Sequence, residues 1–315
     1  MFKSRFSGTF EFFNRKTSDM LFSFPLPPSY GYTSYYANIG DMRNRGLELE
    51  LKGVVMQTKD FYWDINVNLT HYKNKVSYLP DERKTMTTPE GVQGYSSGVH
   101  FFGEGIPLYT FYMQKYAGVN ELGEALYYKD VNGDGVVNTG ANTVDNPGDR
   151  SIIGNSTPRY NFGLTLDAAW KGFDFSIDFA YQIGGKVYDG DYASAMSSPT
   201  ANSKGSVIHA DILNAWTPEN TTSNIPRFQY GDSYTASSSD RFLTSGSYLS
   251  LQNINFGYTL PTKVCRPLGI QKLRLYLAAD NVALWTKRQG LDPRQDIKGE
   301  GTASYYAPIR TVSGG

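Results

Sequence analysis

Cysteine and histidine are scarce in this sequence of 315 residues. Cys265 is the only cysteine, which excludes a disulfide framework or a cysteine-based metal site. His71, His100 and His209 are the only histidines, and no two of them have the spacing of metal ligands. Long apolar runs are absent too: none approaches the roughly 18 residues that a membrane-spanning helix needs, and mean hydropathy is −0.43. The class of helical membrane proteins is therefore excluded.

Net charge is also missing, because 30 basic residues balance 30 acidic ones. Because the chain has no excess of basic residues, we expect no nucleic-acid partner. No phosphate-binding glycine loop occurs in the sequence. Asp174 and Asp178 could form the carboxylate pair of a glycosidase, but polar groups lining a pore explain them more simply. We expect no enzymatic activity.

Tyrosine, phenylalanine and glycine are abundant: the chain has 24, 18 and 32 of them. From Tyr160 to Trp170 and again from Phe173 to Ile183, apolar or aromatic residues alternate with small or polar ones. A period of two places the two sets on opposite faces of a strand. Lys171-Gly172 joins the runs tightly, which predicts a β-hairpin. Each run has the length of a strand that crosses a bilayer at a tilt, roughly 9–11 residues.

The same alternation predicts about ten strands along the chain. They lie near residues 5–12, 47–52, 61–70, 109–113, 126–128, 160–170, 173–183, 247–260, 273–277 and from 305 onward. A phase slip in the eighth predicts a bulge near Gln252-Asn253. The connections alternate between long and short, which is typical of an outer-membrane barrel with long extracellular loops and short periplasmic turns. Because wide barrels need roughly 16 strands, we expect an all-β, antiparallel transmembrane β-barrel segment of a larger barrel.

Several motifs occur in one order across nearly the whole chain. They are 38–49 (NIGDMRNRGLEL), 130–135 (DVNGDG), 149–154 (DRSIIG), 157–160 (TPRY), 215–220 (AWTPEN), 225–227 (IPR), 247–254 (SYLSLQNI), 257–261 (GYTLP), 280–281 (DN) and 290–293 (GLDP). In this combination the sequence resembles the C-terminal half of the barrel in SusC/RagA-type TonB-dependent transporters.

That resemblance implies an importer of glycan or peptide fragments in the outer membrane of a Gram-negative, Bacteroidetes-type bacterium. It implies four kinds of partner: a SusD-like surface lipoprotein that lids the barrel, the TonB-ExbB-ExbD complex acting through a plug, outer-membrane lipid, and an oligosaccharide or peptide substrate. The mechanism would be binding and gated passage without bond chemistry.

Three departures from the family pattern shape the expected domain organisation. Residues 1–315 would form the C-terminal part of the barrel domain, since the plug, the TonB-contacting segment and the first barrel half are absent. Ser250 stands where the family usually has arginine. The final strand lacks the usual alternating, aromatic-ended tail and looks truncated, and residues 1–6 lack the apolar core of a signal peptide.

Residues 130–138 have the oxygen spacing of an EF-hand-like calcium loop. The ligands would be Asp130, Asn132, Asp134, the Val136 carbonyl and Asn138. The twelfth position is alanine, so Asp145 or Asp149 would have to replace the usual bidentate glutamate. A metal-free Asx/Gly turn uses the same residues, and both interpretations stay open. Any Ca²⁺ bound here would be structural.

Aromatic side chains in two predicted loops could contact a ligand or partner. Trp216 could offer a stacking surface to a sugar, and Tyr35 and Tyr36 belong to a tyrosine cluster that could touch glycan or the lid protein. Packing roles inside the loops explain the same residues. There are two alternative hypotheses. One is a soluble, calcium-stabilised carbohydrate-binding β-protein, and the other is an outer-membrane barrel with a structural or adhesive role. Detergent dependence and co-purification with a SusD-like lipoprotein distinguish them.

Calcium binding is a direct test of the loop at residues 130–138. If the loop is a calcium site, titration calorimetry should detect binding in the range of about 0.1–1 mM, typical of extracellular modules. Asp134→Ala should abolish the heat because it removes a ligand. Absence of heat in the unaltered protein at millimolar calcium would leave only the metal-free turn.

Overall fold

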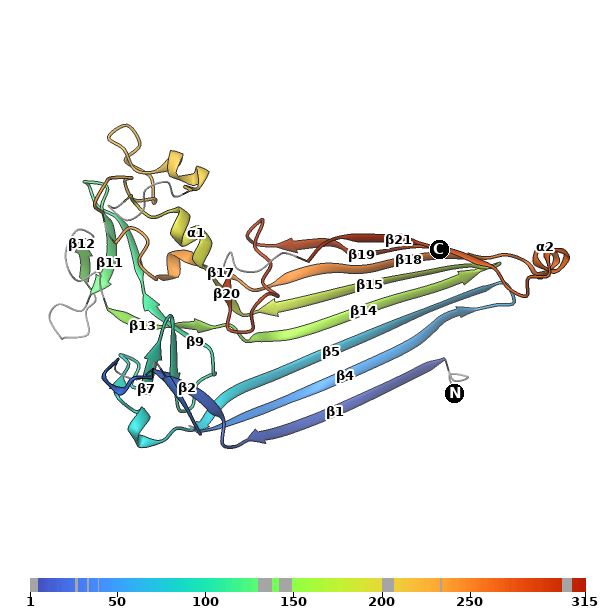
Figure 1. The fold of residues 1–315 in the computed structure, drawn as a ribbon, viewed down its shortest axis with the longest axis horizontal. Helices are drawn as coiled ribbons and strands as arrows, with labels where there is room; N and C mark the ends of the chain where they lie inside the picture. Colours follow the sequence, from blue (N-terminus) through green and yellow to red (C-terminus); the bar gives the residue numbers. More distant parts are fainter. Residues whose placement is uncertain are drawn as a thin grey trace.

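The structure is a computed structural model in which almost all regular structure is β-strand. It describes residues 5–25, 28–32, 34–38, 40–129, 138–141, 149–199, 207–232, 234–301 and 308–315. Figure 1 shows long strands lying side by side and a lobe of short strands and helices at one of their ends. No helix in the described ranges is long and apolar enough to cross a membrane.

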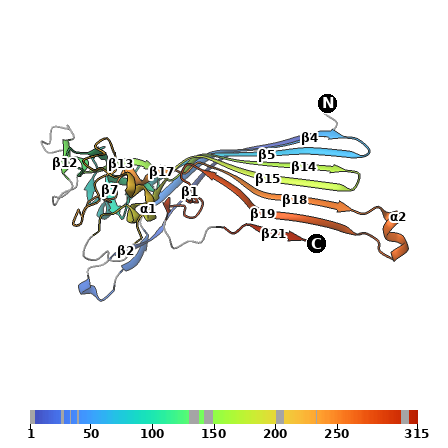
Figure 2. The same cartoon turned by 90° about the horizontal axis from the view of Figure 1, so that it is seen from above.

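Eight strands of the described chain form one antiparallel sheet, which we call the wall. In spatial order they are β1 (Phe6–Thr17), β4 (Asp41–Gln57), β5 (Phe61–Tyr78), β14 (Pro158–Trp170), β15 (Phe173–Gly184), β18 (Tyr248–Thr259), β19 (Arg274–Thr286) and β21 (Thr311–Gly314). The wall is open, with β1 and β21 as its edges. Figure 2 shows its strands running from the lobe toward the short links at the far end.

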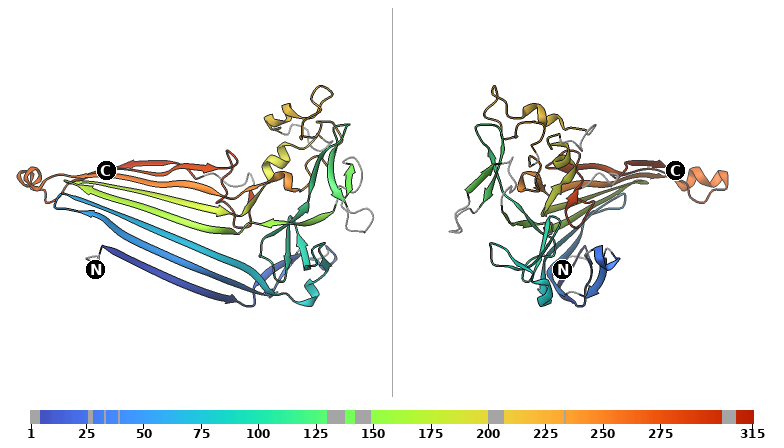
Figure 3. Two further views of the ribbon diagram at one scale, coloured as in Figure 1. Left: turned by 180° about the vertical axis from the view of Figure 1, so that it is seen from behind. Right: turned by 60° about the vertical axis from the view of Figure 1, so that its left-hand side comes forward.

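The connections between wall strands alternate as predicted. Residues 58–60, 171–172 and 260–273 form the short links, and residues 18–40, 79–157, 185–247 and 287–310 form the long ones at the opposite end (Figure 3). The tightest link has positive φ at both residues, 46° at Lys171 and 94° at Gly172. Two successive positive φ values are characteristic of the turns that match the twist of a hairpin. The widest short link contains α2 (Thr262–Cys265) and η5 (Arg266–Leu268).

The all-β, antiparallel class is confirmed, but the wall has eight strands in the described residues instead of about ten. The segments near 109–113 and 126–128 form β9 (Thr110–Gln114) and β11 (Ala125–Lys129), which pair within smaller sheets of the 79–157 connection. Both have five residues and are too short to cross a bilayer. The period of two identifies a strand but does not say which sheet it joins.

The register of the wall separates apolar and polar side chains onto two faces. Direct neighbours on the apolar face are Leu69–Phe162–Tyr181, Val67–Leu164–Phe179 and Ile65–Leu166–Ile177. On the polar face they are Asn66–Thr165–Asp178 and Asp64–Asp167–Ser176. From Tyr160 to Trp170 a strand rises roughly 34 Å at about 3.4 Å per residue, or roughly 26 Å when tilted by about 40°. That height matches the apolar band of a transmembrane barrel, about 25 Å.

A bulge lies in β18 where the phase slip predicted it. Asn253 pairs with Asp178 of β15 and Leu251 pairs with Phe179, so Gln252 is the extra residue. The bulge restores the inward and outward alternation, which would otherwise invert for half of the strand.

The long connections fold into the lobe at one end of the wall, which we call the cap. Its sheets are β13-β9-β8-β7-β6, β10-β11-β12, β17-β16-β20 and β2-β3. The strands not yet bounded are β2 (Leu21–Pro25), β3 (Ser34–Asn38), β6 (Met86–Thr87), β7 (Gln93–Ser97), β8 (His100–Gly103), β10 (Tyr116–Val119), β12 (Asn138–Ala141), β13 (Arg150–Asn155), β16 (Lys186–Asp189), β17 (Leu243–Ser245) and β20 (Glu300–Gly301). Short helices complete it: η1 (Pro28–Tyr30), η2 (Asp81–Arg83), α1 (Gly190–Ala195), η3 (Ala210–Asn214) and η4 (Asp240–Phe242). β2 and β3 pair as a hairpin within the 18–40 connection.

Buried apolar side chains of the described chain gather in the cap rather than in the wall. Phe101, Phe111, Met113, Tyr127 and Phe242 have no exposed surface. The apolar face of the wall, by contrast, presents exposed Phe, Leu and Trp side chains along its strands. The cap therefore has a water-excluded core of its own, whereas the wall needs an apolar environment outside the chain.

Adjacent residues on opposite faces of β15 offer a matched test of this arrangement. Ile177→Arg places a charge on the apolar face and should destabilise the folded protein in lipid vesicles by about 2–4 kcal/mol if that face contacts lipid. Ser176→Arg places it on the polar face among carboxylates and should change stability by less than about 0.5 kcal/mol. Denaturant unfolding in vesicles measures both. Equal tolerance of the two substitutions would contradict a lipid-facing surface.

Candidate functional site

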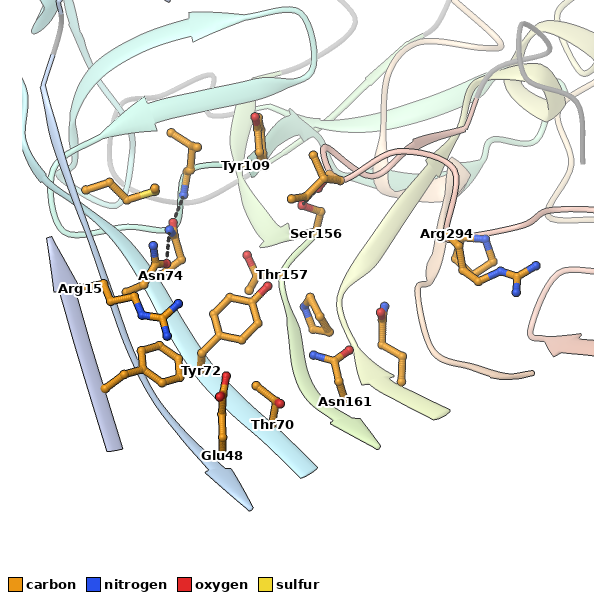
Figure 4. Close-up of a pocket in the computed structure, with 18 of the residues that line it drawn as sticks. Arg15, Glu48, Thr70, Tyr72, Asn74, Tyr109, Ser156, Thr157, Asn161 and Arg294 are labelled. Atoms are coloured by element: carbon orange, nitrogen blue, oxygen red, sulfur yellow. Dashed lines mark hydrogen bonds between the residues drawn. The ribbon is translucent and has the colours of Figure 1, made fainter. Parts of the chain in front are cut away.

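A hollow of about 710 Å³ lies where the polar face of the wall meets the cap (Figure 4). Six wall strands contribute to its lining: β1, β4, β5, β14, β15 and β18. The cap contributes residues 108–109 and 156–157, and the connection after β19 contributes Pro293, Arg294 and Ile297. β4 and β5, with 17 and 18 residues, are longer than a bilayer crossing requires. Their cap-side ends therefore extend beyond the apolar band and line the hollow.

Aromatic rings on β1 and β5 line one side of the hollow, separated by a glycine of β4. Phe13, Gly46 and Tyr72 are direct neighbours across the three strands. A Cβ atom on Gly46 would lie 2.5 Å from Cζ of Phe13. Only glycine lets the Phe13 ring lie against β4 at this point, so Gly46 determines the shape of the aromatic side.

Amide side chains join the wall to the cap beside these rings. Asn74 Nδ2 donates to Asn44 Oδ1 at 2.7 Å, and Asn74 Oδ1 accepts from the backbone N–H of Leu108 at 2.9 Å. Figure 4 shows Asn74, Asn161 and Tyr72 along the wall side of the hollow. Amides supply donors and acceptors together, so this surface suits a neutral, polar ligand such as a peptide bond or a sugar hydroxyl.

Two opposite charges also line the hollow, Arg15 on β1 and Glu48 on β4. The Arg15 guanidinium lies 3.9 Å from Glu11 and 4.8 Å from the centroid of the Phe13 ring. Because Arg15 and Glu48 stand on the same side of the hollow (Figure 4), they could recognise the charged ends of a short chain.

On the far side of the hollow, Arg294 is held by Asp292 and Ser250. Its guanidinium donates to both carboxylate oxygens of Asp292, at 2.9 and 2.7 Å, and to Ser250 Oγ at 3.1 Å. Burial by itself would raise the pKa of Asp292, but the hydrogen bonds from Arg294 outweigh it and hold that pKa below its ordinary value. Ser250 is buried on β18, and its hydroxyl oxygen accepts this hydrogen bond from Arg294. It is the position at which the family resemblance implies an arginine.

The connection containing Arg294 also forms hydrogen bonds with other segments of the cap. Ser156 Oγ donates to the Ile297 carbonyl at 2.9 Å, and His100 Nε2 donates to the Lys298 carbonyl at 2.9 Å. Nδ1 of His100 lies 3.1 Å from Glu300, and the hydrogen bond from His100 lowers the pKa of that carboxyl. Residues 292–300 thus bridge the wall, the sheet of β8 and the strand β16.

The aromatic residues singled out from the sequence lie away from the hollow. Tyr35 and Tyr36 are on β3 with exposed fractions of 44% and 75%, and Arg83 donates to the Tyr35 hydroxyl at 2.7 Å. Trp216 packs its indole over Gly123, where a Cβ atom would clash with the ring. This contact makes Trp216 an anchor between two cap segments. A ligand-binding role for the three side chains stays a prediction.

The predicted calcium loop cannot be placed on the structure. Asp130, Asn132, Asp134 and Val136 lie outside the described residues, and Asn138 is described only as the first residue of β12. In the described part of the chain, no group of three or more His, Cys, Asp or Glu side chains could hold a metal ion.

Removing the Asp292 carboxylate tests how residues 292–300 are held. Asp292→Asn should cost about 1.5–3 kcal/mol, because the hydrogen bonds involve charged groups. Proteolytic cleavage in this segment should then be roughly ten- to a hundredfold faster. Because the pKa of Asp292 is lowered in the folded state, the same loosening should appear in the unaltered protein as pH falls below its ordinary value of about 3.8. Asp191→Asn, an exposed residue of α1, serves as control. Equal cleavage of both variants would show that the Asp292–Arg294 pair does not hold the segment.

Comparison with known proteins gives consistent matches along the chain. Residues 1–282 match the family model described as TonB dependent receptor-like, beta-barrel. TonB-dependent receptor P3 of Formosa agariphila is 29% identical over 315 residues, covering 95% of this chain and 30% of the relative. TonB-dependent receptor SusC of Bacteroides thetaiotaomicron is 26% identical over 305 residues, covering 92% and 28%. The chain spans about 30% of the length of the curated relatives it matches.

Solved structures match with similar coverage. The structure of the RagAB peptide transporter has a TM-score of 0.80 at 29% identity, covering 99% of this chain and 33% of the matched chain. The RagAB peptide importer in its open-open state has a TM-score of 0.73 at 27% identity, covering 95% and 31%.

Proposed function

Because this chain belongs to the TonB dependent receptor-like β-barrel family, we propose that it forms part of an outer-membrane importer of peptide or glycan fragments. The chain would be the C-terminal part of a longer barrel, because eight wall strands are about half of the roughly 16 that a wide barrel needs. The observation that carries the proposal is the hollow on the polar face of the wall, directly beneath the cap.

The orientation follows from the connections. In outer-membrane barrels the long connections face the outside and the short turns face the periplasm. The cap then lies at the cell surface, and the hollow is the first polar chamber below it. A fragment released from the surface would contact the Phe13 and Tyr72 rings and the neighbouring amides before moving along the polar face.

Partners belong to the same proposal. A SusD-like surface lipoprotein would deliver substrate to the cap, and the TonB-ExbB-ExbD complex would supply energy through a plug in the full-length protein. The match to the RagAB peptide transporter supports a peptide substrate, and the relative named SusC supports a nutrient transporter of that type. The work done is binding and gated passage. Structural calcium in the 130–138 loop is part of the proposal as well.

Substituting one ring of the hollow tests this function in the full-length gene product. Tyr72→Ala removes a stacking surface worth about 0.5–1.5 kcal/mol, so substrate affinity should fall roughly threefold to tenfold. Uptake of labelled peptide and oligosaccharide mixtures by whole cells, with outer-membrane protein levels measured in parallel, reports the loss and the substrate class. Tyr181→Ala, on the apolar face, is the matched control and should leave uptake unchanged. If the Tyr72→Ala variant takes up substrate as the unaltered protein does, the hollow is not part of the transport path.

A further inference from the structure

Five basic side chains lie together on three neighbouring wall strands, and we call them the basic patch. Lys16 of β1, Arg43 of β4 and Lys75 of β5 form one cross-strand row. Arg45 of β4 and Lys73 of β5 form the next row toward the short links, beside Asn14 of β1. All five are exposed. The patch is separate from the hollow, because alternation along each strand places it on the opposite face of the wall from Asn44, Tyr72 and Asn74.

The basic patch continues directly from the apolar band. The next row toward the short links, after Arg45 and Lys73, consists of Phe12, Leu47 and His71. The centroids of the Tyr160 and His71 rings are 4.8 Å apart. One pleat of two residues, roughly 7 Å, therefore separates the last apolar row from the first basic one. Figure 1 shows these strand ends at the cap side of the wall, where β1, β4 and β5 meet the cap.

Most of this positive charge has no acidic partner among the described residues. Lys16 pairs with Asp41 at 2.6 Å, but no ion pair is found there for Arg43, Arg45, Lys73 or Lys75. Arg43 donates instead to the neutral Asn14 at 2.8 Å, and the Arg45 guanidinium lies 5.9 Å from the centroid of the Phe12 ring.

Like charges face each other directly across the strands of the patch. Arg43 is opposite both Lys16 and Lys75, and Arg45 is opposite Lys73. Such like-charge neighbours destabilise a sheet. An anion that bridges the two strands would remove that cost, so the arrangement favours a bound anion.

We propose that the basic patch binds the phosphate groups of an anionic lipid headgroup in the leaflet at the cap side. This inference rests on the proposed function, in which the apolar face contacts lipid. Headgroup phosphates lie just beyond the hydrocarbon core, at the height where the patch follows the apolar band. Arginine binds phosphate through two parallel N–H donors and lysine adds a compact charge. The shared face of the patch and the apolar band favours a lipid over a soluble anion or an acidic protein.

Lipid binding by the full-length gene product, purified in mild detergent, tests the proposal. The probe is diphosphorylated lipid A, titrated while native mass spectrometry counts the lipids bound. The double variant Arg45→Gln/Lys73→Gln should weaken binding by at least about tenfold. The control Lys59→Gln/Lys171→Gln removes two charges at the short links and should bind as the unaltered protein does. Inorganic phosphate at millimolar concentration should not displace the lipid.

Three outcomes would overturn the lipid assignment. They are equal lipid binding by the patch and control variants, displacement by inorganic phosphate, and loss of a co-purified acidic protein from the patch variant with lipid binding intact. Heat-modifiable gel migration verifies that each variant is folded, and the single substitutions replace the double one if it is not. A protein that stays folded without detergent would refute the outer-membrane proposal itself. If the protein needs detergent to stay folded but the patch and control variants bind lipid equally, only the lipid-binding proposal for the basic patch is refuted.

Discussion

The backbone register of the wall is the constraint on which the other features depend. Side chains alternate with a period of two, so a slip by one residue between neighbouring strands would move every apolar side chain to the polar face. From β1 to β19 the pairing keeps most Phe, Leu, Ile and Trp side chains on one face and most Asn, Thr, Ser and Asp side chains on the other. Phe13, which lines the hollow on the polar face, is an exception. The bulge at Gln252 corrects the single place where the sequence pattern of β18 would break this order.

The cap and the wall place their apolar side chains in two different environments. The cap buries its own apolar core around Phe101, Phe111 and Phe242, as a water-soluble domain does. The wall leaves its apolar face uncovered, which fits the lipid-facing surface of the barrel family to which the chain belongs. The hollow lies at the boundary between them. Its polar lining is held from the cap by Leu108 and Ser156 and from the connection after β19 by Arg294.

Much of the wall was predictable because its signals are local. Alternation located most of the wall strands, the link at Lys171-Gly172 located the tightest hairpin, and the phase slip located the bulge. The excess of predicted strands came from β9 and β11, whose short alternation is the same in a cap sheet as in a wall. The functional surface was harder to predict. The strand prediction that ended at residue 70 stopped short of Tyr72 and Asn74, which continue the same alternation along β5 and line the hollow.

The sequence by itself determined the class of fold, the order of long and short connections and the motif order that resembles a transporter barrel. Each of these depends on neighbours in the chain or on a period of two. Only the tertiary structure decided which residues meet: Phe13 with Gly46, Arg294 with Ser250, and the cations of three strands in one patch. Those contacts join residues tens of positions apart. They depend on strand register and on how the cap folds back over the wall, and no local pattern encodes either.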